Sequence, residues 1–396
     1  MKIGIDISTW HNGRGFGRFT REVITALLKL PTSHEFILFG DSPGRLDIAP
    51  DRADQITVQT KALVTESAVS DGNRSVGDVL AFTRAVARQK PDVLFYPAVY
   101  SWFPAPPGMP VVLTLHDAIA EHFPELVFPQ WRNRFFWNLK MRLARWQATR
   151  FLTVSNAARE EIHTHLGIDL DRIDLTTEGP KDAFQPPEDE QDRESQRSEI
   201  IRRYELPEDG QLFTYVGGFA PHKNLLGLLD SLDTLKAGDR YRNVRLFMVG
   251  DYSGHGFHSN YEELRARIDA SERLRDAVVF TGFIEDEELA SIYRASVAMV
   301  LPSFSEGFGL PAVEAMACGT PVLASNRASL PEVVGSGGIL FDPGDRDEMA
   351  RAMEQVLASE QELTTLRQRA LAQAGHFTWE AAARGVLTSI ERCRGA

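Results

Sequence analysis

Short apolar runs alternate with amphipathic stretches along most of the chain. The apolar runs are rich in β-branched and aromatic residues, as in strands that are buried on both faces of a sheet. The stretches between them, such as 19–30 and 76–88, carry apolar residues at helical spacing. This alternation predicts parallel sheets covered by helices. The expected strands are 3–7, 35–39, 93–96, 111–115 and 151–154 in a first series, and 212–216, 244–249, 277–280, 297–301 and 321–324 in a second.

The two series of strands predict two domains. A chain of 396 residues exceeds the size at which a single hydrophobic core usually stops growing. Between the series, residues 186–197 are highly charged and contain no expected strand. We place an interdomain hinge at 178–187 and expect a surface loop or the start of a helix after it. The predicted division is an N-terminal domain over 1–180, a C-terminal domain over 181–378 and a helix over 379–396.

The amino-acid composition indicates a globular protein and argues against some kinds of ligand and partner. Hydrophobic residues make up 43% of the chain and charged residues 25%, which is ordinary for a globular protein. The net charge of −12 argues against a nucleic-acid partner, which would need a basic face. With only Cys318 and Cys393, neither a disulfide framework nor a cysteine-based zinc site is expected.

The N-terminal segment and the lengths of the apolar runs bear on localisation. The chain opens directly with an expected strand, so we expect no signal peptide. No apolar run approaches the roughly 18 residues of a membrane-spanning helix. We therefore expect a cytoplasmic protein whose membrane contact is at most peripheral, on the inner membrane face.

Two glutamates, Glu306 and Glu314, lie eight positions apart around a glycine-flanked loop that opens a helix. Pro311 suits the first position of that helix, because its missing N–H would have no partner there. The unpaired N–H groups at the helix start form a positive pocket for a phosphate. Carboxylates beside such a pocket repel phosphate but accept hydrogen bonds from hydroxyls, so the pattern predicts a sugar nucleotide. The backbone of this pocket is expected to come from Gly307, Phe308, Gly309 and Leu310.

The Glu306 to Glu314 segment, with its flanks within 301–322, resembles the E-x7-E region of retaining glycosyltransferases. More narrowly, it is similar to the large family four of the GT-B fold, and the agreement continues through 329–343. The resemblance implies two Rossmann-like, doubly wound domains that face each other across a cleft, with a C-terminal helix that crosses back to the N-terminal domain. It also implies transfer of a hexosyl group from a nucleoside diphosphate sugar to an acceptor hydroxyl, with retained anomeric configuration.

Residues 215–224 follow the first strand of the second domain and contain glycines and a lysine. Lys223 is a suitable point charge for a pyrophosphate, and Gly218 lets a ligand approach the backbone. The family's commonest pattern has an arginine where this chain has Gly218, so Lys223 must carry more of the charge, or another cation compensates. The candidates for that compensation are Arg14, Arg18 and His222.

A glycine-containing segment, 12–18, follows the first strand and opens a helix. It is a poor dinucleotide fingerprint, because the third glycine of G-x-G-x-x-G would fall on Arg18. The resemblance makes Gly15 and Gly17 part of the loop that faces the donor phosphate and the acceptor, and a plain tight turn is the alternative. Arg18 either lends positive charge or lies on the helix surface.

Residues 114–117 lie at the end of a buried strand. By resemblance, His116 reaches the transferred sugar near its 6-position. Asp117 either contributes to that site or caps a helix. In the second domain, Ile284 lies in the segment where the family's backbone meets the nucleotide base.

The resemblance assigns a role to each candidate residue. Glu306 holds a hydroxyl of the transferred sugar, Glu314 accepts hydrogen bonds from the ribose, and Lys223 stabilises the departing diphosphate. His116 and Glu306, with Lys223, are the candidate catalytic residues. Neither a metal nor another cofactor is expected, because the lysine and the helix end supply positive charge. Asp169 and Asp171 have the D-x-D spacing of the metal sites in other glycosyltransferases. Because they do not lie between the donor-site motifs, we interpret them as solvated loop residues rather than as metal ligands.

The expected partners are a nucleotide sugar donor and a saccharide, lipid-linked or small-molecule acceptor. The motifs resemble mannosyltransferases of surface-polysaccharide assembly somewhat more than sucrose or glycogen enzymes, so the hexosyl group is expected to be mannosyl or glucosyl. One alternative is a non-catalytic sugar-nucleotide-binding subunit, which only Gly218 supports. A dehydrogenase is opposed by the glycine pattern, and a PLP-dependent phosphorylase by the chain length and the absence of its lysine motif.

Residues 130–150 hold six Lys or Arg and five aromatic residues without an acidic residue. Trp131, Phe135, Leu139, Leu143 and Trp146 follow helical spacing. Such a stripe is typical of a helix that packs on a sheet, and we favour that interpretation. A basic amphipathic helix with tryptophans can also lie on an anionic membrane, so peripheral membrane or acceptor contact is the alternative.

Overall fold

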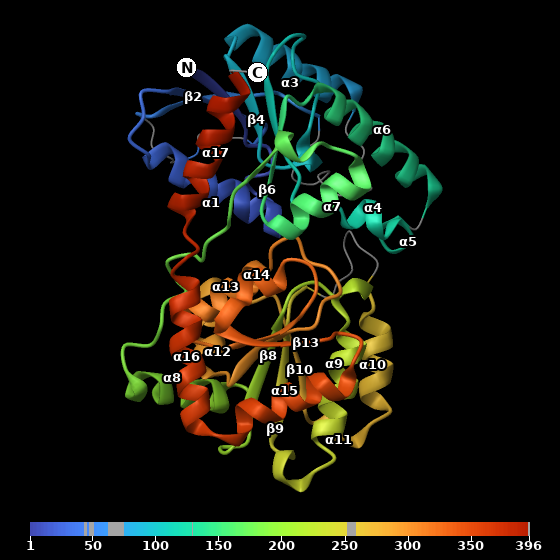
Figure 1. Ribbon diagram of the computed structural model, residues 1–396, viewed down its shortest axis with the longest axis vertical. Coiled ribbons are helices and arrows are strands. Elements are labelled where there is room, and N and C mark those ends of the chain that lie inside the picture. Colours follow the sequence, from blue (N-terminus) through green and yellow to red (C-terminus); the bar gives the residue numbers. More distant parts are fainter. Residues whose placement is uncertain (43–45, 47–50, 62–74, 129, 252–258, 395–396) are drawn as a thin grey trace. The chain divides into compact units, whose positions relative to one another are not determined.

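The computed structural model describes residues 1–396 except 43–45, 47–50, 62–74, 129, 252–258 and 395–396. The chain forms two compact units. Each contains one parallel sheet with helices packed on it (Figure 1), and the predicted α/β class with two doubly wound sheets is confirmed. Unit 1 comprises Met1–Glu178 and Thr378–Ala396, and unit 2 comprises Gly179–Phe377.

In the described part of unit 1, seven parallel strands lie in the order β3-β2-β1-β4-β5-β6-β7. The central strand β1 pairs with β2, where Ile3 lies opposite Phe36, and with β4, where Ile3 lies opposite Val93. The strand order therefore reverses between β1 and β4. The strands are β1 (Lys2–Asp6), β2 (Glu35–Gly40), β3 (Ala53–Thr57), β4 (Val93–Tyr96), β5 (Val111–Thr114), β6 (Arg150–Thr153) and β7 (Ile173–Leu175).

Within the described residues of unit 2, six parallel strands follow the same plan, in the order β10-β9-β8-β11-β12-β13. The order reverses between β8 and β11, which pair where Ala298 lies opposite Phe213. Ligands of doubly wound sheets bind beyond the carboxyl ends of the strands at this reversal. The strands are β8 (Gln211–Val216), β9 (Val244–Val249), β10 (Val278–Gly282), β11 (Ala298–Leu301), β12 (Val322–Ser325) and β13 (Gly338–Phe341).

Three strands, β3, β7 and β13, were not predicted from the sequence. All three lie at the edge of a sheet. Only Ala53 of β3 and Phe341 of β13 are buried, and the last residue of β7 is exposed. β3 and β7 contain no continuous apolar run, and that of β13 is only three residues long, so these edge strands lack the pattern by which the central strands were found.

Helix α1 begins at Gly15, four positions before the expected start at 19. The Arg14 carbonyl already accepts hydrogen bonds from the N–H groups of Gly17 and Arg18, each at 3.0 Å. The other described helices of unit 1 are α3 (Val76–Gln89), α4 (Ile119–His122), α5 (Pro124–Val127), α6 (Trp131–Gln147), α7 (Asn156–Leu166) and α17 (Trp379–Arg394).

The helices of unit 2 begin with α8 (Glu190–Arg203), which occupies the charged segment after the expected hinge. Helices α9, α10 and α15 pack together, and α13 packs against α12, α14 and α16. The described helices are α9 (Leu225–Leu235), α10 (Tyr261–Asp269), α11 (Glu272–Arg275), α12 (Asp286–Ala295), α13 (Leu310–Ala317), α14 (Leu330–Val334), α15 (Arg346–Ala358) and α16 (Glu360–Ala374). Each described helix of the two units is too short or too polar to cross a bilayer.

The C-terminal helix α17 belongs to unit 1, although the whole of unit 2 precedes it in the sequence. It packs on α1 and on strands β4 to β7, as Figure 1 shows in red beside blue. Asp174 of β7 anchors it, accepting hydrogen bonds from Ser389 at 2.7 Å and Arg392 at 2.9 Å. The Thr176 hydroxyl also donates to the Ala382 carbonyl at 2.9 Å. Unit 1 is therefore built from two separate parts of the sequence.

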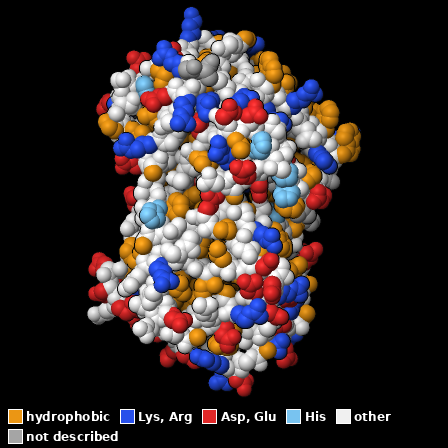
Figure 2. All heavy atoms as spheres, viewed as in Figure 1, with side chains coloured by type: hydrophobic (Ala, Val, Ile, Leu, Met, Phe, Trp, Pro, Cys, Tyr) orange, Lys and Arg blue, Asp and Glu red, His pale blue; other side chains and the backbone are white. Residues whose placement is uncertain are grey.

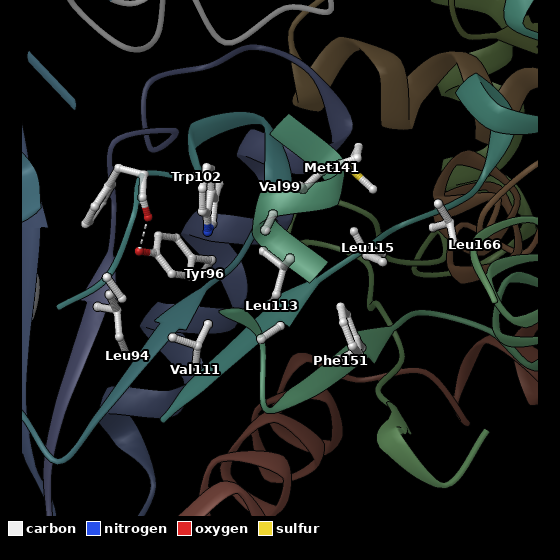
Figure 3. Packing of buried hydrophobic residues seen from close by; sticks show 14 of the residues in the cluster. Leu94, Tyr96, Val99, Trp102, Val111, Leu113, Leu115, Met141, Phe151 and Leu166 are labelled. Carbon is white, nitrogen blue, oxygen red and sulfur yellow. Dashed lines mark hydrogen bonds between the residues drawn. The ribbon is translucent and has the colours of Figure 1, made fainter. Parts of the chain in front are cut away.

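A large apolar cluster of unit 1 lies between the sheet and helices α3, α6 and α7. Leu94, Leu113 and Phe151 contribute from three neighbouring strands, and Met141 contributes from α6 (Figure 3). The Tyr96 hydroxyl, buried in this cluster, donates a hydrogen bond to the Phe103 carbonyl at 2.7 Å. The cluster thereby satisfies a polar group that would be costly to bury alone.

The favoured interpretation of residues 130–150 is wrong. The stripe expected to pack on the sheet is exposed: Trp131 is 74% exposed and Trp146 is 84% exposed. A second apolar set packs inward instead, formed by Trp137, Met141 and Ala144. The helix thus has two apolar faces, and the three residues of the shorter set, not the longer stripe, form the core contact.

Candidate functional site

The loops that follow β8 and β11 meet at the strand reversal of unit 2. The first ends in a short 3-10 turn, Pro221–Lys223, and the second carries Glu306. A backbone hydrogen bond of 2.8 Å from the Phe304 N–H to the His222 carbonyl joins the two loops. The Asn224 amide donates to the Pro302 carbonyl after β11 at 3.2 Å and to the Pro343 carbonyl after β13 at 2.8 Å. These bonds hold the lysine and the glutamate in one place.

Lys223 and Glu306 form a two-pronged ion pair. The Lys223 Nζ lies 2.7 Å from Oε1 and 2.8 Å from Oε2 of Glu306. The two side chains are only 18% and 12% exposed. The Ser303 hydroxyl donates a further hydrogen bond of 2.6 Å to Oε1. The carboxylate is therefore fixed in orientation on two sides.

The charges of this pair shift the pKa of its neighbours. Burial raises the pKa of Glu306, but the charge and hydrogen bonds of Lys223 and the Ser303 bond outweigh it, so the pKa lies below its ordinary value. Burial, with the nearby Lys223 charge, lowers the pKa of His222 to about 4. At neutral pH the site without a ligand therefore holds an ionised Glu306 beside a neutral His222. Compensation by His222 at a bound diphosphate stays a prediction.

The segment after Glu306 turns sharply into α13. Gly309 has a φ of +98°, and a Cβ placed there would lie 2.8 Å from the Leu330 side chain. Glycine is needed at this turn because other residues are strained at such a φ. Having no side chain, Gly309 cannot cap the helix, and Pro311 is the second helical residue rather than the first. At the helix start Pro311 has no N–H, and the Ala312 N–H donates to the Gly309 carbonyl at 2.9 Å. Binding of an anion at the positive end of α13 stays a prediction.

Ser329 fixes the loop between Glu306 and α13 through its hydroxyl group. Its hydroxyl lies 3.0 Å from the carbonyl of Glu306 and 2.8 Å from that of Phe308. Glu314 follows on α13 and is 1% exposed. Lys223 and Glu306 are therefore in contact in unit 2, and the Gly307 to Leu310 segment and Glu314 follow Glu306 in the same unit. Their roles at a donor stay predictions.

Two further predicted residues lie at the strand ends of unit 2. Gly218, after β8, is exposed, and a Cβ placed there meets nothing within 4 Å. Ile284 follows β10 and is 9% exposed, whereas its neighbour Phe283 is 71% exposed. A Cβ at position 218, where the resemblance would place an arginine, therefore meets no steric obstacle.

In unit 1, His116 lies just after β5 at the carboxyl edge of the sheet. Its Nε2 lies 3.0 Å from the Pro97 carbonyl, and its Nδ1 lies 3.8 Å from Oε1 of Glu178. Burial lowers the pKa of His116 to about 4, although the bond to Pro97 acts in the opposite direction. Because a carbonyl can only accept, the neutral ring donates from Nε2. The role of His116 at a sugar stays a prediction.

The glycine segment of unit 1 has a packing explanation. A Cβ on Gly17 would lie 2.1 Å from the Asn12 carbonyl oxygen, so only glycine fits there, whereas Gly15 faces open space. Arg18 is half-buried in the first turn of α1. Asp117 lies one residue before Ala118, the N-cap of α4, and accepts a hydrogen bond from the Ile119 N–H at 3.0 Å. Donor contact by these residues stays a prediction.

Sequence reasoning missed the residues that hold the donor loops in place. Ser303, Ser329 and Asn224 were not singled out, because isolated serines and asparagines are common in loops. Ser303 had one detectable signal, its position three residues before a candidate catalytic carboxylate. The other two act over long sequence distances, which the local pattern does not encode.

Two family models match the chain. The model described as Glycosyltransferase Family 4 matches residues 13–179, and the model described as Glycosyl transferases group 1 matches 196–373. The first match therefore ends one residue beyond Glu178, where this part of unit 1 ends, and the second lies within unit 2. Together the two models span most of the chain.

Individual relatives agree with these models. The chain is 32% identical over 229 residues to the O-antigen chain mannosyltransferase B of Escherichia coli, covering 58% of this chain and 57% of that one. It is 32% identical over 251 residues to the D-inositol 3-phosphate glycosyltransferase of Rhodococcus opacus (strain B4), covering 61% and 53%. These alignments thus span little more than half the length of the curated relatives.

The fold also matches solved structures over nearly the full length. A crystal structure of Anabaena HepE in complex with UDP and glucose superposes with a TM-score of 0.71 at 18% identity, covering 98% of this chain and 99% of that one. At this identity the likeness concerns the fold alone. The two family models, which together match most of the chain, show that it belongs to the family 4 glycosyltransferases, with its Glycosyltransferase Family 4 part at 13–179 and its Glycosyl transferases group 1 part at 196–373.

Proposed function

We propose that the protein is a retaining glycosyltransferase that moves a hexosyl group from a nucleoside diphosphate sugar to an acceptor hydroxyl. The observation that carries this proposal is the buried Lys223–Glu306 pair, which lies at the strand reversal of unit 2 and just before the positive end of α13. The mannosyltransferase relative favours a mannosyl group, with glucosyl as the alternative, in glycan or surface-polysaccharide assembly. HepE, crystallised with UDP and glucose, supports a nucleotide donor.

The donor's diphosphate would bind at Lys223 and the first N–H groups of α13. When the bond between the sugar and the phosphate oxygen breaks, the electron pair stays on that oxygen, and negative charge builds up there. Lys223 and the helix end stabilise this charge, which lowers the barrier. Because they supply the positive charge at the phosphate, we propose that transfer needs no metal ion or other cofactor.

The carboxylates would serve the two sugars of the donor. Glu306 accepts a hydrogen bond from a hydroxyl of the transferred sugar, and its negative charge favours the positive character of the reacting carbon. Glu314 accepts hydrogen bonds from the ribose. The acceptor hydroxyl attacks from the face that the diphosphate leaves, and the departing phosphate oxygen takes its proton. The new bond then has the configuration of the old one.

When the donor binds, the Lys223 ammonium group would contact two anions, the Glu306 carboxylate and the diphosphate. In the structure Lys223 contacts both oxygens of Glu306, and a bound diphosphate would take one of these contacts. Ser303 would keep Glu306 oriented while Lys223 turns toward the phosphate. Unit 1 would bind the acceptor, which is a saccharide, a lipid-linked sugar or a small molecule. We also propose that the reaction takes place in the cytoplasm.

A thermal-shift screen with UDP-, GDP-, ADP- and TDP-sugars, with and without Mg²⁺, tests the donor site. A ligand at about 100 times its dissociation constant adds roughly 2.7 kcal/mol of stability, which is readily detected. We expect a shift with one nucleotide family that metal does not change. Glu314→Gln should weaken that shift, while Glu362→Gln, an exposed change on α16, should not. Equal donor affinity in both variants would contradict the role of Glu314.

The alternative, a non-catalytic subunit that binds sugar nucleotides, rests on Gly218 standing where the family usually has an arginine. A turnover assay with the donor found in the screen separates the two functions. We expect release of the nucleoside diphosphate in the presence of a mannose- or glucose-containing acceptor. Donor binding without turnover, in the parent chain and in Gly218→Arg alike, would favour the subunit.

A further inference from the structure

Helix α6 presents a large apolar surface to solvent. More than half of the exposed large hydrophobic residues in the described part of the chain belong to this one helix. In Figure 2, hydrophobic and basic side chains lie side by side at the outer end of α6. We name this surface the α6 outer face. It consists of Trp131, Phe135, Phe136, Leu139, Leu143 and Trp146.

The α6 outer face lies opposite the side of the helix that packs on the core. At about 100° per residue, its six side chains span an arc of roughly 140°, centred about 180° from the buried Trp137, Met141 and Ala144. The inner set, together with a 2.8 Å hydrogen bond from the Trp137 indole to Glu121, holds the helix on unit 1. The outer face therefore does not stabilise the described fold of unit 1.

The charged residues around the α6 outer face indicate which kind of partner can bind it. Residues 130–150 contain six Lys or Arg without an acidic residue, although the chain as a whole carries −12. Arg132 and Arg142 project within the apolar arc, and both are exposed. A partner must therefore accept apolar side chains and be anionic over the same area.

An anionic lipid surface meets both conditions better than a protein does. Between two proteins, Arg132 and Arg142 would be buried among apolar side chains and would need a matching acid each. At a bilayer, long basic side chains extend to the headgroup phosphates while their apolar neighbours enter the acyl boundary. Trp131 and Trp146, roughly 22 Å apart along the helix axis, are the residue type that anchors in this zone at both ends.

We propose that α6 docks unit 1 on an anionic membrane surface, lying in the plane of the interface with its outer face in the lipid. This inference stands apart from the proposed transfer reaction, because it depends only on α6 and its exposed side chains.

Vesicle flotation of the full chain tests the docking. We expect binding to phosphatidylcholine vesicles that contain one third phosphatidylglycerol, and much weaker binding to phosphatidylcholine alone. Phe135→Ser/Leu139→Ser should lower the partition coefficient at least tenfold, because two side chains leave the lipid. Arg132→Glu/Arg142→Glu should lower it by a similar factor, and raised salt should mimic that loss.

A matched control lies on another helix of the same unit. Val76 and Leu80 of α3 are also exposed apolar residues, and Val76→Ser/Leu80→Ser should leave vesicle binding unchanged. Absence of binding to the anionic vesicles, or equal binding by the α6 variants and the parent, would overturn the proposal. Self-association abolished by Phe135→Ser/Leu139→Ser, without vesicle binding, would show instead that a second copy covers this face. None of these measurements uses a donor, so their outcome is separate from that of the turnover assay.

Discussion

Lys223 and Glu306 are two opposite charges that unit 2 shields from water together. Each depends on the other, since a single buried charge without its partner costs several kcal/mol. The pair is therefore a structural element as well as a candidate part of the chemistry. A double-variant cycle, which compares each single variant with the double variant, can separate the contribution of the pair to stability from its contribution to turnover.

Replacing Lys223 by Met should affect both roles. Glu306 is left buried without its cation, so we expect a loss of about 3 to 5 kcal/mol in the stability of unit 2. Donor turnover should fall by roughly 10² to 10³, the usual cost of losing one preorganised charge contact. Calorimetry and initial rates measure the two effects.

The double variant Lys223→Met/Glu306→Gln distinguishes them. Removing both charges should restore most of the lost stability, because no unpaired charge remains, while turnover stays low. Lys29→Met, an exposed change at the end of α1, serves as the control. Recovery of turnover in the double variant would contradict the role of Lys223 at the diphosphate.

His116 makes unit 1 sensitive to acid. Its pKa of about 4 in the folded chain lies below the ordinary value of 6.5, because burial disfavours the charged ring. Between these values the unfolded chain binds a proton that the folded chain does not, so stability is lost as pH falls from 6.5 to 4. The loss from this residue should reach about 2 kcal/mol at pH 5.

His116→Gln should remove that loss while its amide keeps a donor for the Pro97 carbonyl. Urea unfolding at pH 7 and pH 5, followed by tryptophan fluorescence, measures it. The probe is specific, because all six tryptophans belong to unit 1. The difference between the two pH values should shrink by about 2 kcal/mol in this variant and stay as in the parent for the exposed His11→Gln. An unchanged difference in His116→Gln would refute the lowered pKa.

At the scale of elements, α13 depends on the turn that precedes it. Gly309→Ala combines a φ of +98° with a Cβ 2.8 Å from Leu330, so we expect a loss of about 1 to 3 kcal/mol in stability. The first N–H groups of α13 should also shift, which would weaken donor affinity. Differential scanning calorimetry and nucleotide titration measure the two effects.

Gly218→Ala is the matched control, because a Cβ at that position has open space. It should change the stability by less than about 1 kcal/mol. If Gly309→Ala proved as mild as Gly218→Ala, the turn before α13 would not need its glycine.

The central strands and the half-buried edge strand β10 were predictable from the sequence, because each contains a run of apolar residues. β3 and β7 have no such run, and that of β13 is only three residues long, so these edge strands did not stand out. The site residues around Glu306 were found because glycine, proline and carboxylate occur there in a local pattern. Ser329, which fixes that loop through tertiary contact, was not.

Helix α6 shows where pattern reading fails for a physical reason. Its outer apolar stripe is longer and more regular than the inner one, so the pattern indicated the wrong face. An apolar stripe shows that a helix prefers a non-aqueous partner, but not whether that partner is the protein's own core. Burial of Trp137 and exposure of Trp146 could be assigned only from the structure.

At the scale of the whole molecule, unit 1 needs the last segment of the chain. Ala382, Val386 and Ile390 of α17 are fully buried within it, and Asp174 receives two hydrogen bonds from the same helix. A chain that ends at Phe377 should therefore lose on the order of 5 kcal/mol of stability in unit 1. Unit 2 keeps all its elements and should retain donor binding.

Tryptophan fluorescence and nucleotide titration of that shortened chain measure the two units separately. We expect the fluorescence-detected unfolding midpoint to fall sharply or the transition to vanish, with donor affinity unchanged. An unchanged midpoint would mean that α17 contributes little to unit 1. Loss of donor binding would mean that unit 2 is not independent.

The placement of α17 also sets an order of events during synthesis. The sheet of unit 1 leaves the ribosome early, but the helix that covers β4 to β7 follows only after roughly 200 further residues, about 10 to 40 s at ordinary translation rates. Throughout that interval the nascent sheet has an apolar face without its cover. Unit 2 can complete its own fold in the meantime, although its sequence comes later. The first half of the protein to be translated is thus the last to be finished, and in a crowded cell its uncovered face is the surface that chaperones or aggregation would reach first.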